Sequence, residues 1–175
     1  MDLMSVPAQR FREKQADYLA EVKAGGHVAL SRYGTTVGVV VPPQDHRRMS
    51  FAVQAVKGLT QRAEPQDDTY ARDIQKVPAH IFRRDQAVHL EKVEKESAHI
   101  AITRYQETLA VVIPIAQYEH ASFAVRLMDG FARLAEADGP NDLSAFAARV
   151  TEEMAHHHDL DGQQQLLLEE VAQAS

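Results

Sequence analysis

The chain has 175 residues, of which 45% are hydrophobic, and it contains no cysteine. This length suits one ordinary domain or two small ones, and the lack of thiols excludes a disulfide framework and a thiolate metal site. No apolar run approaches the length of a membrane span, and the start MDLMSVPAQR lacks a charged region followed by an apolar one. We therefore expect a cytoplasmic protein without membrane contact.

The net charge of −6 is unevenly distributed along the chain. Residues 1–57 carry 8 Lys/Arg against 5 Asp/Glu, whereas residues 132–175 carry 2 against 9. A basic to neutral body followed by an acidic end favours different partners for the two regions. An acidic tail that serves only solubility explains the charge equally well.

One segment of the sequence occurs twice. VPAQRFREKQADYLAEVKAGGHVALSRYGTTVGVVVP, from Val6, returns from Val77 as VPAHIFRRDQAVHLEKVEKESAHIAITRYQETLAVVIP. The offset is 71 residues in the first part of the repeat and 72 from His27 and His99 onward. Each copy is small for independent stability, so we expect the two copies to share one core, like a homodimer in a single chain.

The first copy begins with SVPA, which could form an edge strand. Apolar residues at helical spacing then predict an amphipathic helix of about three to four turns over residues 11–22. Gly25 and Gly26 are expected to end this helix, because glycine adopts a positive φ without steric cost.

Two β-rich segments follow, residues 27–33 and 35–41, and Gly34 between them suits a tight hairpin turn. Pro42 and Pro43 are expected to stop the second strand, and residues 45–59 again show helical spacing. In the second copy Gln106 replaces Gly34, so we expect that hairpin to turn differently.

The second copy repeats this order as a short strand at KVPA, a helix over residues 82–93, strands over 99–105 and 108–114, and a helix over about 116–135. We predict an α+β fold in which two β-α-β-β-α units form a pseudo-dimer with a shared antiparallel sheet, followed by C-terminal helices. The expected domains are residues 1–60, a linker over 61–74, residues 75–137, and an acidic helical segment over 138–175.

The pattern within each copy resembles the Phd/YefM family of antitoxins: a helix with an Arg near its start, a V-x-[IL]-[ST]-R-[RY]-G hairpin, and an apolar strand. The matching residues in the first copy are Arg12, Leu19, Gly25, Val28, Leu30, Ser31, Arg32, Tyr33, Gly34 and Val39 to Val41. Those in the second are Arg83, Leu90, Ile100, Ile102, Thr103, Arg104, Tyr105 and Val111 to Ile113. The resemblance covers roughly residues 4–57 and 75–129, and the chain departs from it in holding two such domains.

This resemblance implies a DNA-binding autorepressor that also neutralises a toxin through its C-terminal segment. For DNA, paired arginines at equivalent positions suit an operator that is read by pseudo-symmetry. The candidate DNA-binding residues are Arg10, Arg12, Lys14, Arg32, Lys76, Arg83, Arg84 and Arg104. In the alternative interpretation, Arg32 and Arg104 flank hairpins in water and Arg12 pairs with a nearby carboxylate.

The acidic segment predicts two amphipathic helices suited to docking on a basic toxin. The candidate toxin-binding residues are Leu143, Phe146, Val150, Met154, Leu167 and Val171. Alternatively, these helices cover the sheet or mediate oligomers. The competing function is a protein-interaction or adaptor module that keeps the fold without DNA binding, and further homo-oligomerisation is possible in either case.

Other chemistry has little support in the sequence. Glu153 and His156 are one helical turn apart, but further ligands are missing, so we expect no metal site. We expect no cofactor and no enzymatic activity, because there is no cysteine nucleophile, phosphate loop or G-x-S-x-G elbow. His27 and His99, the repeated histidines, are expected to begin strands rather than to act as bases.

Overall fold

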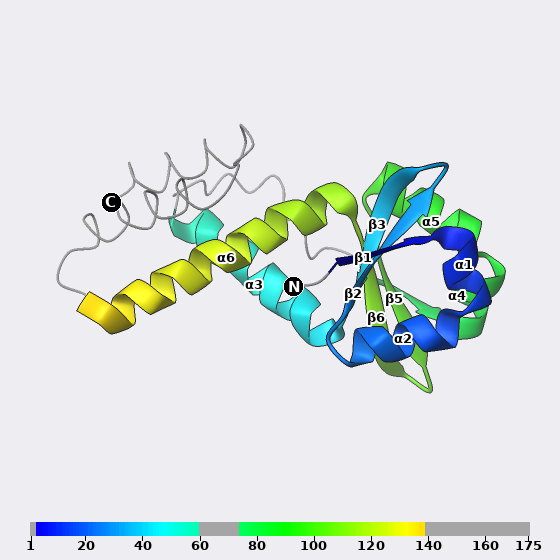
Figure 1. Ribbon diagram of the computed structural model, residues 1–175, viewed down its shortest axis with the longest axis horizontal. Coiled ribbons are helices and arrows are strands. Elements are labelled where there is room, and N and C mark those ends of the chain that lie inside the picture. Colours follow the sequence, from blue (N-terminus) through cyan, green and yellow to red (C-terminus); the bar gives the residue numbers. More distant parts are fainter. Residues whose placement is uncertain (1–2, 60–73, 139–175) are drawn as a thin grey trace. The chain divides into compact units, whose positions relative to one another are not determined.

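The computed structural model describes residues 3–59 and 74–138 (Figure 1). These residues belong to two compact units, one comprising residues 3–47 and 74–119 and the other residues 48–59 and 120–138. The first unit contains a sheet and four short helices. The second contains most of two longer helices, which begin in the first unit.

The element order repeats within the chain. In the first half it is β1 (Leu3–Pro7), α1 (Ala8–Glu13), α2 (Gln15–Lys23), β2 (His27–Arg32), β3 (Thr35–Val41) and α3 (Pro43–Leu59). In the second half it is β4 (Ile74–Pro78), α4 (Ala79–Arg84), α5 (Gln86–Glu96), β5 (His99–Arg104), β6 (Glu107–Pro114) and α6 (Ile115–Asp138). The predicted α+β class and the predicted edge strand before each helix are confirmed.

The six strands form one sheet in the order β1-β2-β3-β6-β5-β4. The pairs β2–β3, β3–β6 and β5–β6 are antiparallel, but β1 runs parallel to β2 and β4 runs parallel to β5. The expectation of an antiparallel sheet is therefore wrong, and the sheet is mixed. The reason is that each edge strand is joined to its neighbour by a helical crossover, which returns the chain in the same direction.

The central strand pair has local twofold pseudosymmetry. Val40 of β3 lies opposite Val112 of β6, and Val112 is the residue of the second copy that is equivalent to Val40, at the offset of 72 residues. The edge pairs have matching registers, since Leu3 lies opposite His27 and Ile74 lies opposite His99. A register shift also occurs at equivalent points, between Leu30 and Ser31 and between Ile102 and Thr103.

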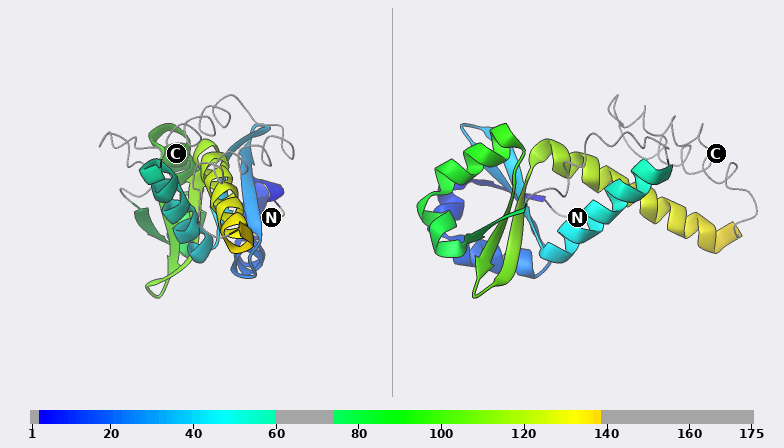
Figure 2. Two further views of the ribbon diagram at one scale, coloured as in Figure 1. Left: turned by 90° about the vertical axis from the view of Figure 1, so that its left-hand side faces the viewer. Right: turned by 180° about the vertical axis from the view of Figure 1, so that it is seen from behind.

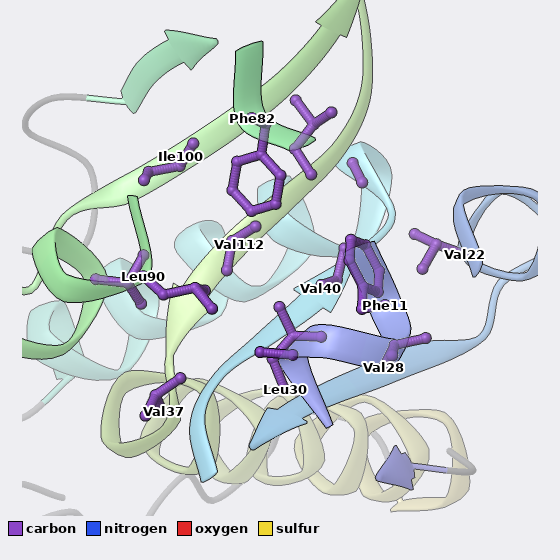
Figure 3. Packing of buried hydrophobic residues seen from close by; sticks show 14 of the residues in the cluster. Phe11, Val22, Val28, Leu30, Val37, Val40, Phe82, Leu90, Ile100 and Val112 are labelled. Carbon is purple, nitrogen blue, oxygen red and sulfur yellow. The ribbon is translucent and has the colours of Figure 1, made fainter. Parts of the chain in front are cut away.

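One face of this sheet carries α1, α2, α4 and α5, and the main apolar core lies beneath them (Figures 1 and 3). Figure 3 shows side chains from both halves converging in this layer, among them Phe11, Val40, Phe82 and Val112. Helix α2 contacts β6, and α5 contacts β3, so each helix reaches over the central strand of the other half. The expected shared core is thus confirmed.

The first helix of each half is broken, which the periodicity did not predict. Lys14 separates α1 from α2 with φ −113° and ψ 34°, and Asp85 separates α4 from α5 with φ −108° and ψ 26°. Both pairs of dihedral angles lie outside the α-helical region, so the helix axis bends at equivalent positions in the two halves. Gln15 and Gln86, which follow the breaks, are buried, whereas a continuous amphipathic helix would bury an apolar side chain there.

The two hairpins turn in the same way, so the expected difference between them is wrong. Tyr33 and Gly34 have φ values of 50° and 82°, and Tyr105 and Gln106 have φ values of 49° and 69°. Positive φ at both central residues is the two-residue turn whose twist matches that of the flanking strands. Pairing of β5 with both β6 and β4 therefore holds Gln106 in a conformation that glycine adopts more easily.

The second unit consists of α3 from Arg48 and α6 from His120 (Figure 2). Arg48 donates hydrogen bonds of 2.7 Å to both carboxylate oxygens of Asp129, which links the two helices. Its buried apolar residues are Met49, Ala52, Val53, Val56, Ala121, Phe123, Ala124, Val125 and Leu127. Among the described helices of both units, none combines the length and hydropathy that spanning a membrane requires.

Candidate nucleic-acid interface

Helices α1 and α4 meet across the local dyad. Their buried phenylalanines, Phe11 and Phe82, hold equivalent positions and lie edge to face, with ring centroids 6.5 Å apart. A second contact crosses between the halves, because the Gln15 side chain donates a hydrogen bond of 3.2 Å to the Ala79 carbonyl. The sequence places an arginine immediately after each phenylalanine, so the buried ring pair also brings Arg12 and Arg83 close to each other on the exposed side.

The exposed side of this junction is hollowed. We call it the dyad hollow, and it is lined by Gln9, Arg12, Glu13, His80, Arg83 and Arg84. These residues form three pairs of equivalent positions: Gln9 with His80, Arg12 with Arg83, and Glu13 with Arg84. The hollow thus combines three arginines with one carboxylate, and clustered guanidinium groups of this kind suit phosphate binding.

Two of the charged side chains in the dyad hollow already have hydrogen-bond partners within the chain. Arg84 binds the neighbouring Asp85 at 2.6 Å, and this hydrogen bond holds the pKa of the Asp85 carboxyl below its usual range. Glu13 accepts a hydrogen bond of 3.2 Å from Gln9. Arg12 and Arg83 are therefore the candidates in this hollow with the fewest competing partners among the contacts found in the described residues.

The other predicted DNA-binding residues are spread over the same unit. Arg10 is exposed on the last turn of α1, and Lys14 is exposed at the break that follows it. Arg32 is half-buried at the end of β2 and lies 3.4 Å from Glu94 of α5. Lys76 of β4 and Arg104 of β5 line one further hollow together. The structure therefore brings together Arg12, Arg83 and Arg84 at one place and Lys76 with Arg104 at another.

The hairpin tips carry a feature that sequence reasoning missed as a candidate site. Tyr33 and Tyr105 are 99% and 91% exposed. The guanidinium carbons of Arg32 and Arg104 lie 5.9 Å and 5.4 Å from the centroids of the adjacent tyrosine rings. An exposed aromatic face beside a cation suits stacking against a base or a sugar. The repeated Arg-Tyr pair in the sequence was the signal that could have identified this feature.

On the other face of the sheet, buried histidines begin β2 and β5, as predicted. His27 Nδ1 lies 2.9 Å from the Tyr118 hydroxyl, and His27 Nε2 lies 2.9 Å from an Asp45 carboxylate oxygen. A carboxylate oxygen accepts, so His27 Nε2 donates to Asp45, and the Tyr118 hydroxyl is the hydrogen-bond partner of Nδ1. His27 is 1% exposed.

The second histidine has an equivalent arrangement with different residues. His99 Nε2 contacts the Gln117 side-chain oxygen, and His99 Nδ1 lies 2.9 Å from His46 Nε2. Each repeated histidine therefore bonds one residue from its own half and one from the other half. These bonds anchor the first turns of α3 and α6 to the sheet, and none of the residues that form them lines the dyad hollow.

The predicted toxin-binding residues, Leu143, Phe146, Val150, Met154, Leu167 and Val171, lie outside the described residues, as do His156 to His158. Comparison of the chain with protein-family models, with curated proteins and with solved structures finds no match. The geometry of the described residues therefore carries the argument for function.

Proposed function

We propose that this chain is a DNA-binding repressor and the antitoxin of a toxin–antitoxin pair, built from two Phd/YefM-like units in one polypeptide. The observation that carries the DNA-binding part is the dyad hollow, in which Arg12 and Arg83 come from equivalent positions in the two halves. A twofold arrangement of cations matches the pseudo-twofold symmetry of an inverted-repeat operator.

The charge distribution supports this proposal. The whole chain is acidic, but eight cations lie among the elements of the first unit at the positions proposed to contact DNA. Phosphate contacts of this kind supply most of the affinity for duplex DNA and are governed by local rather than net charge. The exposed Tyr33 and Tyr105 add stacking surfaces beside two of these cations.

The antitoxin part rests on the resemblance and on the composition of residues 138–175. Nine acidic residues against two basic ones in the stretch 132–175 complement a basic partner protein. Amphipathic segments that fold on binding can cover a large surface of such a partner. In this proposal DNA and toxin are bound by separate parts of the chain.

DNA binding is tested by nuclease footprinting on the DNA upstream of the chain's own coding sequence, together with repression of a reporter driven by that DNA. We expect a protected segment and repression for the wild type, and loss of both for Arg12→Ala combined with Arg83→Ala. The matched control is Arg126→Ala combined with Arg133→Ala, which removes the same charge from exposed positions of α6. Equal protection by both double variants would remove the dyad hollow from the interface. Absence of any protection by the wild type would favour the adaptor function.

Toxin binding is tested by co-expressing the chain with the product of the neighbouring gene. We expect the two proteins to purify together and the chain to restore growth. Phe146→Asp combined with Leu167→Asp is expected to abolish both effects, because a charge on the apolar face opposes docking. Co-purification that survives this double variant would place the toxin contact elsewhere on the chain.

A further inference from the structure

The cationic surface of the first unit is continuous on the side of the second hairpin, where Lys23 of α2 lies beside residues of the second half. A hollow between α2 and β6, which we call the helix hollow, is lined by Gln15, Leu19, Lys23, Arg83, Arg104 and Glu107, among others. A hollow beside the second hairpin, which we call the hairpin hollow, is lined by Lys76, His80, Arg104 and Tyr105, among others. Arg83 lines both the dyad and helix hollows, and Arg104 lines both the helix and hairpin hollows. Shared residues therefore join the three hollows.

The equivalent positions on the side of the first hairpin, where α5 of the second half lies over β3, carry less positive charge. Lys23 in the helix hollow corresponds to Glu94, and Lys76 in the hairpin hollow corresponds to Ser5. The remaining residues of the two hollows follow the same correspondence: Arg83 is equivalent to Arg12, Arg104 to Arg32, and Glu107 to Thr35. Four cations and one carboxylate on one side correspond to two cations and one carboxylate on the other.

The arginines at the two hairpins also differ in their partners. Arg32 lies 3.4 Å from the Glu94 carboxylate, which competes with a phosphate for the guanidinium group. Arg32 also contributes to a lowered pKa of the Glu91 carboxyl, although the hydrogen bond from Lys95 is the main cause. Arg104 instead shares the helix hollow with Lys23, which is the equivalent of Glu94, and with Glu107. A phosphate at Arg104 therefore has a second cation nearby beside one carboxylate, whereas Glu94 takes the place of that cation beside Arg32.

We propose that the chain binds duplex DNA with a fixed polarity, in which the side of the second hairpin is the dominant phosphate-binding side and the side of the first hairpin binds weakly. This inference rests on the proposed DNA binding and adds to it a direction. A symmetric homodimer has no such direction, because its two halves carry the same residues. The duplicated chain can lose cations from one side of its dyad without losing them from the other.

Single-charge exchanges between equivalent positions test the difference in affinity. The probe is a duplex selected by the wild-type chain from a random-sequence pool. Arg104→Ala is expected to weaken binding about tenfold, and Arg32→Ala less than about twofold. Lys76→Ser and Lys23→Glu, which copy the side of the first hairpin, are expected to weaken binding, and Glu94→Lys and Ser5→Lys, which copy the side of the second hairpin, are expected to strengthen it. Equal losses for Arg104→Ala and Arg32→Ala would overturn the inference.

The polarity itself is tested by directed cleavage. The chain has no cysteine, so Tyr33→Cys and Tyr105→Cys each provide one attachment point for a DNA-cleaving reagent at an exposed hairpin tip. We expect each conjugate to cut the selected duplex on one side only, and the two conjugates to cut on opposite sides. Cutting by both conjugates on both sides would overturn the polarity and leave DNA binding intact. A wild-type chain that selects no duplex at all would overturn the proposed function, and the polarity with it.

Discussion

His46 and His99, from opposite halves of the chain, are joined by a hydrogen bond of 2.9 Å between Nε2 and Nδ1. His99 Nε2 contacts the Gln117 oxygen and therefore donates, so His99 Nδ1 accepts from His46. Both rings are buried. Burial, the adjacent His99 and Arg47 lower the pKa of His46 to about 4, and burial also lowers the pKa of His99.

This pair predicts a loss of stability in mild acid. Well above pH 6.5 both rings are neutral in the folded and unfolded states. As the pH falls from about 6.5 to about 4, the unfolded chain binds a proton at His46 that the folded chain does not bind. Each pH unit in this window costs roughly 1.4 kcal/mol of unfolding free energy for one such histidine. His99 contributes with the same sign.

His46→Tyr is the variant that tests this prediction, because the equivalent position already carries Tyr118, whose hydroxyl bonds His27. Urea unfolding should show the pH dependence between pH 6 and pH 4.5 reduced by roughly 1.4 kcal/mol per pH unit. Above pH 7 the wild type should show no dependence from this pair. An unchanged slope in the variant would show that His46 does not remain neutral in the folded chain.

The second hairpin turn offers a stabilising substitution. Gln106 has φ 69°, and Gly34 occupies the equivalent position with φ 82°. Gln106→Gly is expected to raise the free energy of unfolding by about 0.5–1 kcal/mol, because glycine adopts positive φ without a clash at its Cβ. The mirror variant Gly34→Gln should lower the free energy by a similar amount, as judged by thermal unfolding. Destabilisation by Gln106→Gly would mean that a contact of the Gln106 side chain stabilises the fold by more than the positive φ of its backbone costs.

His89 is expected to be a source of instability. Its ring is buried and stacks on Phe82 with centroids 5.6 Å apart, and neither ring nitrogen has a hydrogen-bond partner among the residues that the structure describes. Burial, the main cause, lowers the pKa of His89. At the equivalent position, Tyr18 stacks on Phe11 at the same centroid distance, 5.6 Å.

His89→Phe should therefore raise the free energy of unfolding by about 1–2 kcal/mol, since it keeps the stacked ring and removes the unpaired nitrogens. Chemical denaturation at pH 7.5 measures this change. His89→Ala is the matched control, and it is expected to destabilise the chain by leaving a cavity against Phe82. If His89→Phe destabilises the chain as much as His89→Ala does, a partner for the imidazole must exist.

Much of the fold could be predicted because its signals are local or repeated. Gly25 and Pro42 marked the ends of a helix and a strand, and the repeat itself predicted that two small sheets would join. The helix breaks at Lys14 and Asp85 could not be predicted, because neither residue is Pro or Gly, and the buried Gln15 after the first break bonds the Ala79 carbonyl of the other half. The conformation of Gln106 was wrongly predicted because strand pairing overrode its local preference.

The site was predictable only in part, for the same reason. The sequence identified Arg12 and Arg83 as equivalent, but their meeting in one hollow depends on contact between Phe11 and Phe82, 71 positions apart. The pairing of Arg32 with Glu94 and the network around His27 likewise depend on residues distant in sequence. Periodicity describes which face of an element is buried but not which element covers it.

The salt dependence of duplex binding tests the central claim most directly. Each phosphate contact that is lost lowers the slope of log affinity against log salt by about 0.9. The account predicts that Arg12→Ala combined with Arg83→Ala lowers this slope by about 2, whereas Arg126→Ala combined with Arg133→Ala leaves it unchanged. Equal slopes for the wild type and both double variants would contradict the claim that DNA binds at the dyad hollow.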